Sequence, residues 1–224
     1  FATIGGGDSN IVVGTLGGVC SGGLNQAGDA PGDSAVFIGG GKANQVLGHF
    51  ACITGGYENT AEGEESTIGG GQFNVAGGDR SGVFSGHDNE ATGYCAAILG
   101  GAYNNASGYM SVVGGGGGFG NDANSATGDY AVVGGGKSNE ANDYWSTVAG
   151  GLNNTAELNY SSVCGGGSNS ASGALSFIGG GGYNEAAGFL SVISGGYYCQ
   201  ATGEASFVGG GEGNIAEGDS SVVC

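Results

Sequence analysis

The segment Asn169–Tyr183 reads NSASGALSFIGGGGY, and variants of these fifteen residues fill the chain from end to end. Numbered from the asparagine, the unit has alanine at position 3, glycine at 5, serine at 8, isoleucine at 10 and glycine at 12 and 13. A short strict period indicates a repeat architecture. We therefore expect one continuous body over residues 1–224. Asparagine opens the units at Asn10, Asn25, Asn44, Asn59, Asn74, Asn89, Asn104, Asn124, Asn139, Asn154, Asn169, Asn184 and Asn214, and Cys199 stands where another is due.

Within each unit, the residue pattern predicts two short strands joined by two corners. Position 10 is always isoleucine or valine and position 8 is small, so positions 8 to 11 predict a strand with 8 and 10 facing inward. Alanine at position 3, between polar neighbours, predicts a second strand. Glycines at 5, 12 and 13 are expected at corners, where a positive φ meets no Cβ clash. Each unit is thus one coil of a parallel β-solenoid of about fourteen coils, stacked about 4.8 Å apart.

Two spacings between the asparagines are longer, at 19 and 20 residues instead of 15. The extra residues fall near 29–33 and near 116–122. Insertions in a solenoid usually leave the stack intact. We expect both to bulge from corners.

The composition restricts the classes of partner. Three basic residues stand against twenty acidic ones, for a net charge of −17. This charge repels nucleic-acid phosphates and anionic lipid. No apolar run approaches the roughly 18 residues that a membrane helix needs. The sequence therefore predicts neither a nucleic-acid partner nor membrane insertion, and no motif indicates a cofactor.

The outward strand positions 7 and 9 are unexpectedly apolar, and we call the following residues the apolar stripe. A stripe of about 1,000 Å² exceeds what soluble monomers usually expose. The stripe predicts a lateral oligomer, and uncapped strand edges predict head-to-tail stacking, so we expect self-association along the stripe, at the strand edges, or both. The alternative is that the strand faces the other way and the stripe is core. The stripe comprises Phe1, Leu16, Phe37, Phe50, Met110, Val112, Tyr130, Val132, Trp145, Tyr160, Leu175, Phe177, Leu190, Val192, Phe207 and Val222.

The asparagine column predicts a ladder of amide hydrogen bonds from coil to coil, as in fibrils. We interpret these residues as structural. By contrast, Asn105, Asn153 and Asn159 lie in N-x-S/T sequons and are glycosylation candidates if the protein is secreted by a eukaryote.

Reactive side chains are few. Asp79, Arg80, His87 and Asp88 form the one mixed cluster within a single unit, and we interpret it as surface scatter rather than an acid–base site. The sequence therefore predicts a protein that is not an enzyme and has no metal site. The six cysteines occupy no common column in adjacent coils, so we expect free thiols or bridges between chains. They are Cys20, Cys52, Cys95, Cys164, Cys199 and Cys224.

The unit N-x-A-x-G-x-x-S-x-V-x-G-G, clear in Ala171–Gly173 and Ser176–Gly179, resembles the head repeats of trimeric autotransporter adhesins. That resemblance implies a left-handed parallel β-roll in a homo-oligomer at the cell surface, with an unknown surface or matrix ligand. The coil here is longer than in that family, and its cysteines are unusual for it. More weakly, the segment Asn169–Gly173 resembles the half-coil of the grass ice-binding β-roll.

These observations favour a non-enzymatic structural protein, namely an extracellular fibre subunit or adhesin shaft that associates with itself. An ice-binding β-roll is the alternative. Glutamates at positions 2 and 4, such as Glu62 and Glu90, count against an ice-binding face there, because charged groups hydrate strongly.

Overall fold

The computed structural model describes residues 1–30, 32, 34–119 and 122–224, and divides them into two compact units, Phe1–Met110 and Ser111–Cys224. Each unit is a parallel β-solenoid whose coils carry two short strands, and the described residues contain no α-helix. The predicted all-β solenoid with fifteen-residue coils is therefore confirmed. A single continuous body over residues 1–224 stays a prediction.

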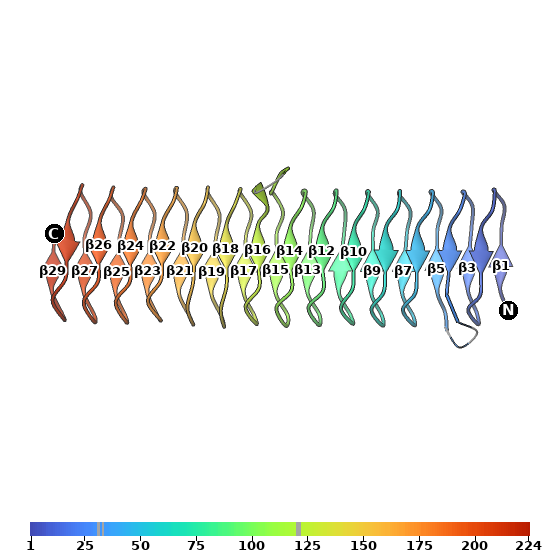
Figure 1. The fold of residues 1–224 in the computed structure, drawn as a ribbon, viewed down its shortest axis with the longest axis horizontal. Helices are drawn as coiled ribbons and strands as arrows, with labels where there is room; N and C mark the ends of the chain where they lie inside the picture. Colours follow the sequence, from blue (N-terminus) through green and yellow to red (C-terminus); the bar gives the residue numbers. More distant parts are fainter. Residues whose placement is uncertain (31, 33, 120–121) are drawn as a thin grey trace. The chain divides into compact units, whose positions relative to one another are not determined.

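The first unit has seven strands in each of two sheets (Figure 1). The odd-numbered strands correspond to positions 9 and 10 of the repeat and the even-numbered strands to positions 2 and 3. The odd strands are β1 (Thr3–Ile4), β3 (Gly18–Val19), β5 (Phe37–Ile38), β7 (Cys52–Ile53), β9 (Thr67–Ile68), β11 (Gly82–Val83) and β13 (Ala97–Ile98). The even strands are β2 (Ile11–Val12), β4 (Gln26–Ala27), β6 (Gln45–Val46), β8 (Thr60–Ala61), β10 (Val75–Ala76), β12 (Glu90–Ala91) and β14 (Asn105–Ala106).

The second unit repeats this arrangement with eight odd and seven even strands. Its odd strands are β15 (Val112–Val113), β17 (Val132–Val133), β19 (Thr147–Val148), β21 (Ser162–Val163), β23 (Phe177–Ile178), β25 (Val192–Ile193), β27 (Phe207–Val208) and β29 (Val222–Val223). Its even strands are β16 (Ser125–Ala126), β18 (Glu140–Ala141), β20 (Thr155–Ala156), β22 (Ser170–Ala171), β24 (Glu185–Ala186), β26 (Gln200–Ala201) and β28 (Ile215–Ala216).

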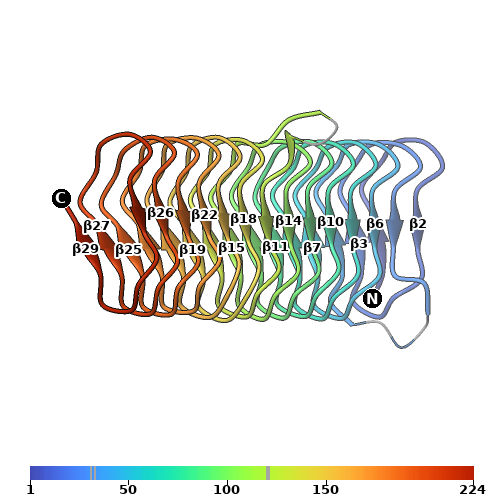
Figure 2. The same ribbon diagram turned by 60° about the vertical axis from the view of Figure 1, so that its left-hand side comes forward.

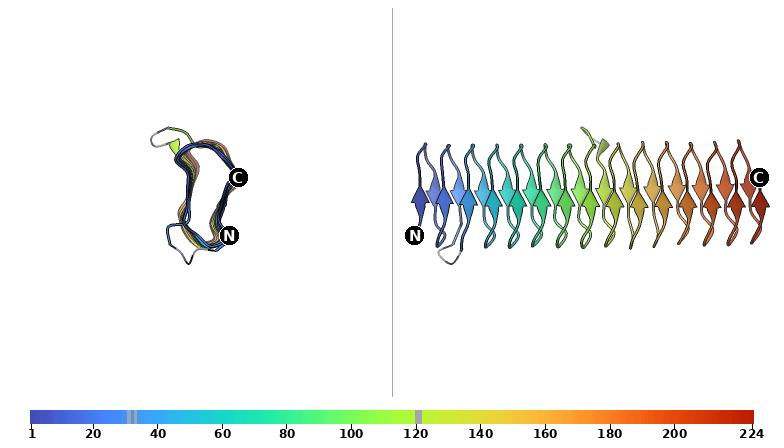
Figure 3. Two further views of the ribbon diagram at one scale, coloured as in Figure 1. Left: turned by 90° about the vertical axis from the view of Figure 1, so that its right-hand side faces the viewer. Right: turned by 180° about the vertical axis from the view of Figure 1, so that it is seen from behind.

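Strands pair with the equivalent strand one coil away, so identical repeat positions lie above one another. Ile178 of β23 pairs with Ile193 of β25, and Ala171 of β22 pairs with Ala186 of β24. Isolated parallel bridges at position 14, such as Gly167 with Gly182, add a third ladder. Figure 2 shows the successive coils from the side, and the view along the stack in Figure 3 shows each coil as a flattened loop.

Of the two predicted insertions, the structure describes all but four residues. Pro31 and Asp33 near 29–33, and Gly120 and Asn121 within 116–122, lie outside the described residues. The flanking strands β4 and β6 still pair with each other, with Ala27 opposite Val46. The stack therefore continues across the first insertion within its unit.

The core of each coil is thin and contains the four inward positions 1, 3, 8 and 10. In the coil that begins at Asn169, the side chains of Asn169, Ala171, Ser176 and Ile178 are all at most 1% exposed. The predicted inward facing of positions 3, 8 and 10 is correct, and the apolar stripe is therefore not core.

The corners differ from prediction in two respects. Position 7 is not part of the strand, because Leu175 has a left-handed φ of 58°, as do its equivalents in other coils and the residues at position 15. Glycine at position 13 has the expected positive φ, for example 93° at Gly181, but glycine at position 5 does not. A Cβ on Gly173 would lie 2.2 Å from the carbonyl oxygen of Gly188. In this coil, glycine at position 5 therefore allows the close approach of the next coil.

The left-handed φ at position 7 predicts that glycine there stabilises the protein. Ala205 has a φ of 52°, a conformation that costs a residue with a Cβ about 1 kcal/mol. We expect Ala205→Gly to raise the free energy of unfolding by about 1 kcal/mol in urea denaturation. Ala187→Gly, at a position without positive φ, is the control and should lower it by about 0.5–1 kcal/mol. Shifts of the same sign in both variants would contradict the assigned conformation.

The buried serines at position 8 are predicted to lower stability, because most of their hydroxyl groups have no hydrogen-bond partner among the described residues. These are Ser66, Ser81, Ser111, Ser161, Ser176, Ser191, Ser206 and Ser221. A buried polar group without a partner is costly, so Ser176→Ala should raise the free energy of unfolding by about 1 kcal/mol. Ser146→Ala should lower it instead, because the Ser146 hydroxyl donates to the Asp143 carbonyl at 2.6 Å. Equal urea midpoints for the two variants would contradict this prediction.

Candidate assembly face

The asparagines at position 1 form a buried hydrogen-bond ladder inside each unit. The Oδ1 atom of Asn169 accepts from the backbone nitrogen and the Nδ2 of Asn184, at 3.1 and 3.0 Å. Its Nδ2 donates to Asn154 Oδ1 and to the carbonyls of Gly165 and Gly181, at 3.0 to 3.1 Å. Every polar atom of the side chain is therefore used, which supports a structural role.

Cys199 interrupts this ladder in the second unit. Its backbone nitrogen donates to Asn184 Oδ1 at 3.0 Å, but its sulfur makes only long contacts, the shortest 3.5 Å to the Gly211 carbonyl. On its far side, the Asn214 side chain donates to the Gly210 carbonyl at 2.6 Å. The coil-to-coil amide chain is therefore broken at this position.

The residues of the apolar stripe are all exposed or half-buried. Trp145, Leu175 and Phe177 are 47%, 42% and 38% exposed. The structure separates the stripe into two neighbouring columns. Position 9 lies on the outer face of the odd strands, whereas position 7 lies at the corner that precedes them.

The outer surface of the odd strands carries no charged residue in either unit. Its side chains come from position 9 and from position 11, which sequence reasoning missed. We call these residues the neutral face. In the first unit it comprises Thr3, Gly5, Gly18, Cys20, Phe37, Gly39, Cys52, Thr54, Thr67, Gly69, Gly82, Phe84, Ala97 and Leu99. In the second unit it comprises Val112, Gly114, Val132, Gly134, Thr147, Ala149, Ser162, Cys164, Phe177, Gly179, Val192, Ser194, Phe207, Gly209, Val222 and Cys224.

In three strands of the neutral face, a phenylalanine ring lies close to the glycine of the same strand. A Cβ placed on Gly179 would lie 3.6 Å from Phe177 Cε1, and one on Gly209 would lie 3.5 Å from Phe207 Cε1. In the first unit, a Cβ on Gly82 would lie 3.9 Å from Phe84 Cε2. Among the described residues, one apolar hollow on this face is lined by Gly5, Gly18 and Phe37 among others, and another by Gly69, Gly82 and Phe84.

The opposite surface, formed by the outward positions 2 and 4 of the even strands, is acidic. It carries Glu62, Glu90, Glu140, Glu157, Glu185 and Glu217. The remaining acidic residues of the described chain lie at the corners or beside the insertions. The signal for the neutral face was therefore present in the sequence, as the lack of acidic residues at positions 9 and 11 in all repeats.

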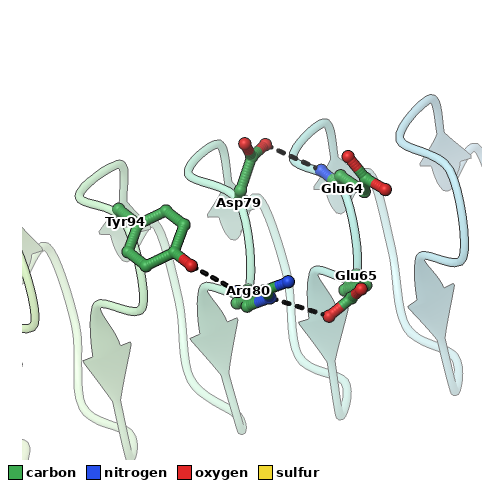
Figure 4. Close-up of polar contacts among 5 residues, drawn as sticks. All are labelled: Glu64, Glu65, Asp79, Arg80 and Tyr94. Carbon is green, nitrogen blue, oxygen red and sulfur yellow. Dashed lines mark hydrogen bonds and ion pairs between the residues drawn. The ribbon is translucent and has the colours of Figure 1, made fainter.

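One corner of the first unit carries a polar cluster that joins three coils (Figure 4). Arg80 Nε lies 2.9 Å from Glu65 Oε2, and the Arg80 guanidinium also donates to the Tyr94 hydroxyl. Its hydrogen bond to Glu65 and the charge of that carboxylate raise the pKa of Arg80. Asp79 Oδ1 accepts from the Glu64 backbone nitrogen at 3.0 Å. The cluster is exposed and ties neighbouring coils together.

Aromatic rings stack on each other along the corners. In the second unit, Tyr130 and Trp145 are parallel with centroids 4.6 Å apart, and Tyr183 and Tyr198 stack at 4.9 Å. A hydrogen bond with Tyr198 raises the pKa of Tyr197. Because these rings pack against one another from coil to coil, part of each ring face is already covered.

The mixed cluster considered as an acid–base site is divided by the fold. Asp79 and Arg80 precede β11, whereas His87 and Asp88 follow it at the other end of the strand. His87 instead contacts the rings of Phe73 and Tyr103, at centroid distances of 5.4 and 5.5 Å. Within the described residues, no three His, Cys, Asp or Glu side chains are grouped to hold a metal ion.

The cysteines are all free, and four of them lie on the neutral face. Cys20, Cys164 and Cys224 are exposed and Cys52 is half-buried, and burial raises the pKa of the Cys52 thiol. Cys95 lies at position 7, beside this face.

Of the sequon asparagines, Asn153 and Asn159 are exposed. Asn105, on β14, is half-buried, and its Oδ1 is buried without a partner in the described chain. Glycosylation of any of the three stays a prediction.

No protein-family model matches the chain, and no curated protein matches it. The part of the chain that the structure describes also contains no helix long and apolar enough to cross a lipid bilayer. Function therefore has to be inferred from the surfaces of the solenoid.

Proposed function

We propose that the protein is a non-enzymatic structural protein, an extracellular fibre or adhesin-shaft subunit that associates with copies of itself through the neutral face. The observation that carries this proposal is the complete lack of charge on that face in a chain of net charge −17. Burying charged groups is costly unless they are paired. The neutral face is the surface on which two such chains can approach without desolvating carboxylates.

The composition of the face supports the same conclusion. Sheets stack face to face about 10 Å apart, and an uncharged surface rich in Val, Phe, Thr and Gly offers apolar area for such stacking. Large exposed apolar patches mark interaction sites. The extracellular location rests on the resemblance to adhesin head repeats, and the head-to-tail mode of association stays a prediction.

A matched pair of variants tests the proposal by light scattering after gel filtration. Ser162 lies on the neutral face and Ser170 on the acidic face, in adjacent strands of the second unit, and both are half-buried. We expect the unmodified chain and Ser170→Lys to elute as oligomers, and Ser162→Lys to elute as a monomer, although each variant adds one positive charge. An unmodified chain that is monomeric at about 100 µM, or equal dissociation of both variants, would refute the proposal.

Ice binding is the second candidate, and the regular, uncharged surface of the neutral face is the observation that favours it. An ice-binding surface must remain free in solution, whereas an assembly face is covered. Thermal hysteresis at concentrations where the chain is monomeric, abolished by Ser162→Lys and kept by Ser170→Lys, would replace self-association by ice binding as the function of this face.

A further inference from the structure

Each odd strand of the neutral face combines a larger with a smaller side chain. Phenylalanine or valine at position 9 is followed by glycine at position 11 in Phe177 with Gly179 and in Val132 with Gly134. Where position 9 is small, as in Gly82 of β11, position 11 is large, as in Phe84. No odd strand has glycine at both positions or aromatic residues at both. In each coil, therefore, a larger side chain at one of the two positions accompanies a smaller one at the other, whichever position carries the larger one.

Packing within one chain explains only part of this compensation. A phenylalanine ring reaches the glycine beside it, as the 3.6 Å approach of Phe177 Cε1 to the Cβ position of Gly179 shows. A valine cannot do so, because outward positions two residues apart on a strand are about 7 Å apart. The strands with Val132 and Gly134, or with Ala97 and Leu99, therefore have a raised and a lowered side. An opposing surface with the reverse order fits such a step.

We infer that the opposing surface is the neutral face of a second copy, parallel and in register, related by a two-fold axis along the stack. This inference rests on the proposed function. In this arrangement, position 9 of each coil faces position 11 of the same coil in the other copy. Val132 then faces Gly134 and Phe84 faces Gly82, so a larger residue opposes a smaller one in every coil. A two-fold interface is self-complementary in this manner.

An antiparallel pair does not give this match. With the two-fold axis along the strands, position 9 faces position 9 of a different coil. Side-chain size at position 9 varies without a symmetric order from Val112 to Val222 in the second unit. Compensation inside each coil would then have no effect on the fit. The parallel, in-register pair is therefore the arrangement in which the pairing of a larger with a smaller side chain in each coil improves the fit.

The neutral face of one unit is small for an interface, so a stable pair needs both a close fit between the side chains and many paired coils. Eight strands about 4.8 Å apart, with an outer surface about 10 Å wide, give the second unit about 400 Å² of neutral face. A standard interface buries about 800 Å² per partner. One unit alone would hold a copy weakly. Repetition of the same fit in every coil of a unit favours the in-register pairing of the same coils.

Cross-linking between two differently labelled copies tests the register. In a background with Cys20, Cys52, Cys95, Cys164 and Cys224 changed to serine, single cysteines are introduced by Thr147→Cys, on β19, and Ala149→Cys, directly after it. A second pair is Val192→Cys, on β25, and Ser194→Cys, directly after that strand. Mixed one to one and treated with a short bismaleimide, both pairs should form cross-linked dimers at least tenfold faster than the offset mixture of Thr147→Cys with Ser194→Cys. That offset separates the thiols by three coils, or about 14 Å.

The outcomes separate this inference from the proposed function. Cross-linking in only one of the two pairs indicates an antiparallel pair, because only one coil can then face itself, and overturns the inference. Preferred cross-linking of the offset mixture also overturns it. In both cases light scattering that still shows oligomers leaves self-association in place. Monomers with no cross-linking in any mixture would overturn the inference and the proposed function together.

Discussion

Replacing Asn169 by alanine is expected to lower the free energy of unfolding by about 5 kcal/mol. The change removes five hydrogen bonds at a side chain that is 1% exposed. It leaves the Gly165 carbonyl and the Asn184 backbone nitrogen without their partner in the ladder, whereas Asn154 Oδ1 still accepts from the backbone nitrogen of residue 169 and the Gly181 carbonyl from that of Gly167. Each lost hydrogen bond contributes about 1 kcal/mol, and each buried group left without a partner costs about 1–3 kcal/mol.

Urea denaturation followed by far-UV circular dichroism measures this loss. Asn142→Ala is the control, because Asn142 is exposed at position 4 and its side chain donates to Glu140 at 3.1 Å on the surface. We expect the control to change the free energy of unfolding by at most about 0.5 kcal/mol. If the two variants had the same urea midpoint, the buried ladder would not contribute to stability.

Replacing Cys199 by asparagine is expected to have the opposite effect and to raise the free energy of unfolding by about 3 kcal/mol. The sulfur occupies the place that Nδ2 takes in other coils. A Cβ on Gly196 would lie 3.0 Å from the Cys199 sulfur, and a Cβ on Gly181, one coil earlier, would lie 2.9 Å from Asn184 Nδ2. The new amide can donate to Asn184 Oδ1 and to the Gly211 carbonyl, and it can accept from Asn214. The ladder then continues through the coil, with about 1 kcal/mol for each restored bond.

Two further substitutions at this position separate hydrogen bonding from volume. Cys199→Ala removes the buried sulfur without adding polar groups and should lower the urea midpoint. Cys199→Gln supplies the same amide one methylene further out and should lower it as well, because an added methylene overpacks a close-packed core. A midpoint for Cys199→Asn at or below that of the unchanged protein would show that the ladder tolerates the gap without cost.

Much of the fold could be predicted from the repeat alone. A fifteen-residue period with one β-branched residue, one alanine and one asparagine at constant positions requires that like residues stack, as Ile178 and Ile193 do. The inward facing of positions 3, 8 and 10 followed from the alternation of residue size and polarity. These features depend on local periodicity, which is complete in the sequence.

The corners could not be predicted in the same manner. Leucine, tyrosine and tryptophan do not favour a left-handed φ, yet Leu175, Tyr183 and Trp145 adopt it. The stacked coils impose this conformation through the backbone bonds of their neighbours, such as the one that Leu175 donates to the Asn159 carbonyl at 2.9 Å. For the same reason, the role of glycine at position 5 became visible only in the approach of Gly173 to Gly188.

The candidate site was predicted in part. The stripe named position 9 correctly as outward, but grouped it with position 7 and omitted position 11. The repeat by itself determined which residues recur, because recurrence is a property of the chain. The tertiary structure alone decided that positions 9 and 11 share one uncharged surface while the glutamates of positions 2 and 4 lie on the opposite one. Which columns lie side by side depends on the path of the chain around each coil, and that path is set by contacts between coils.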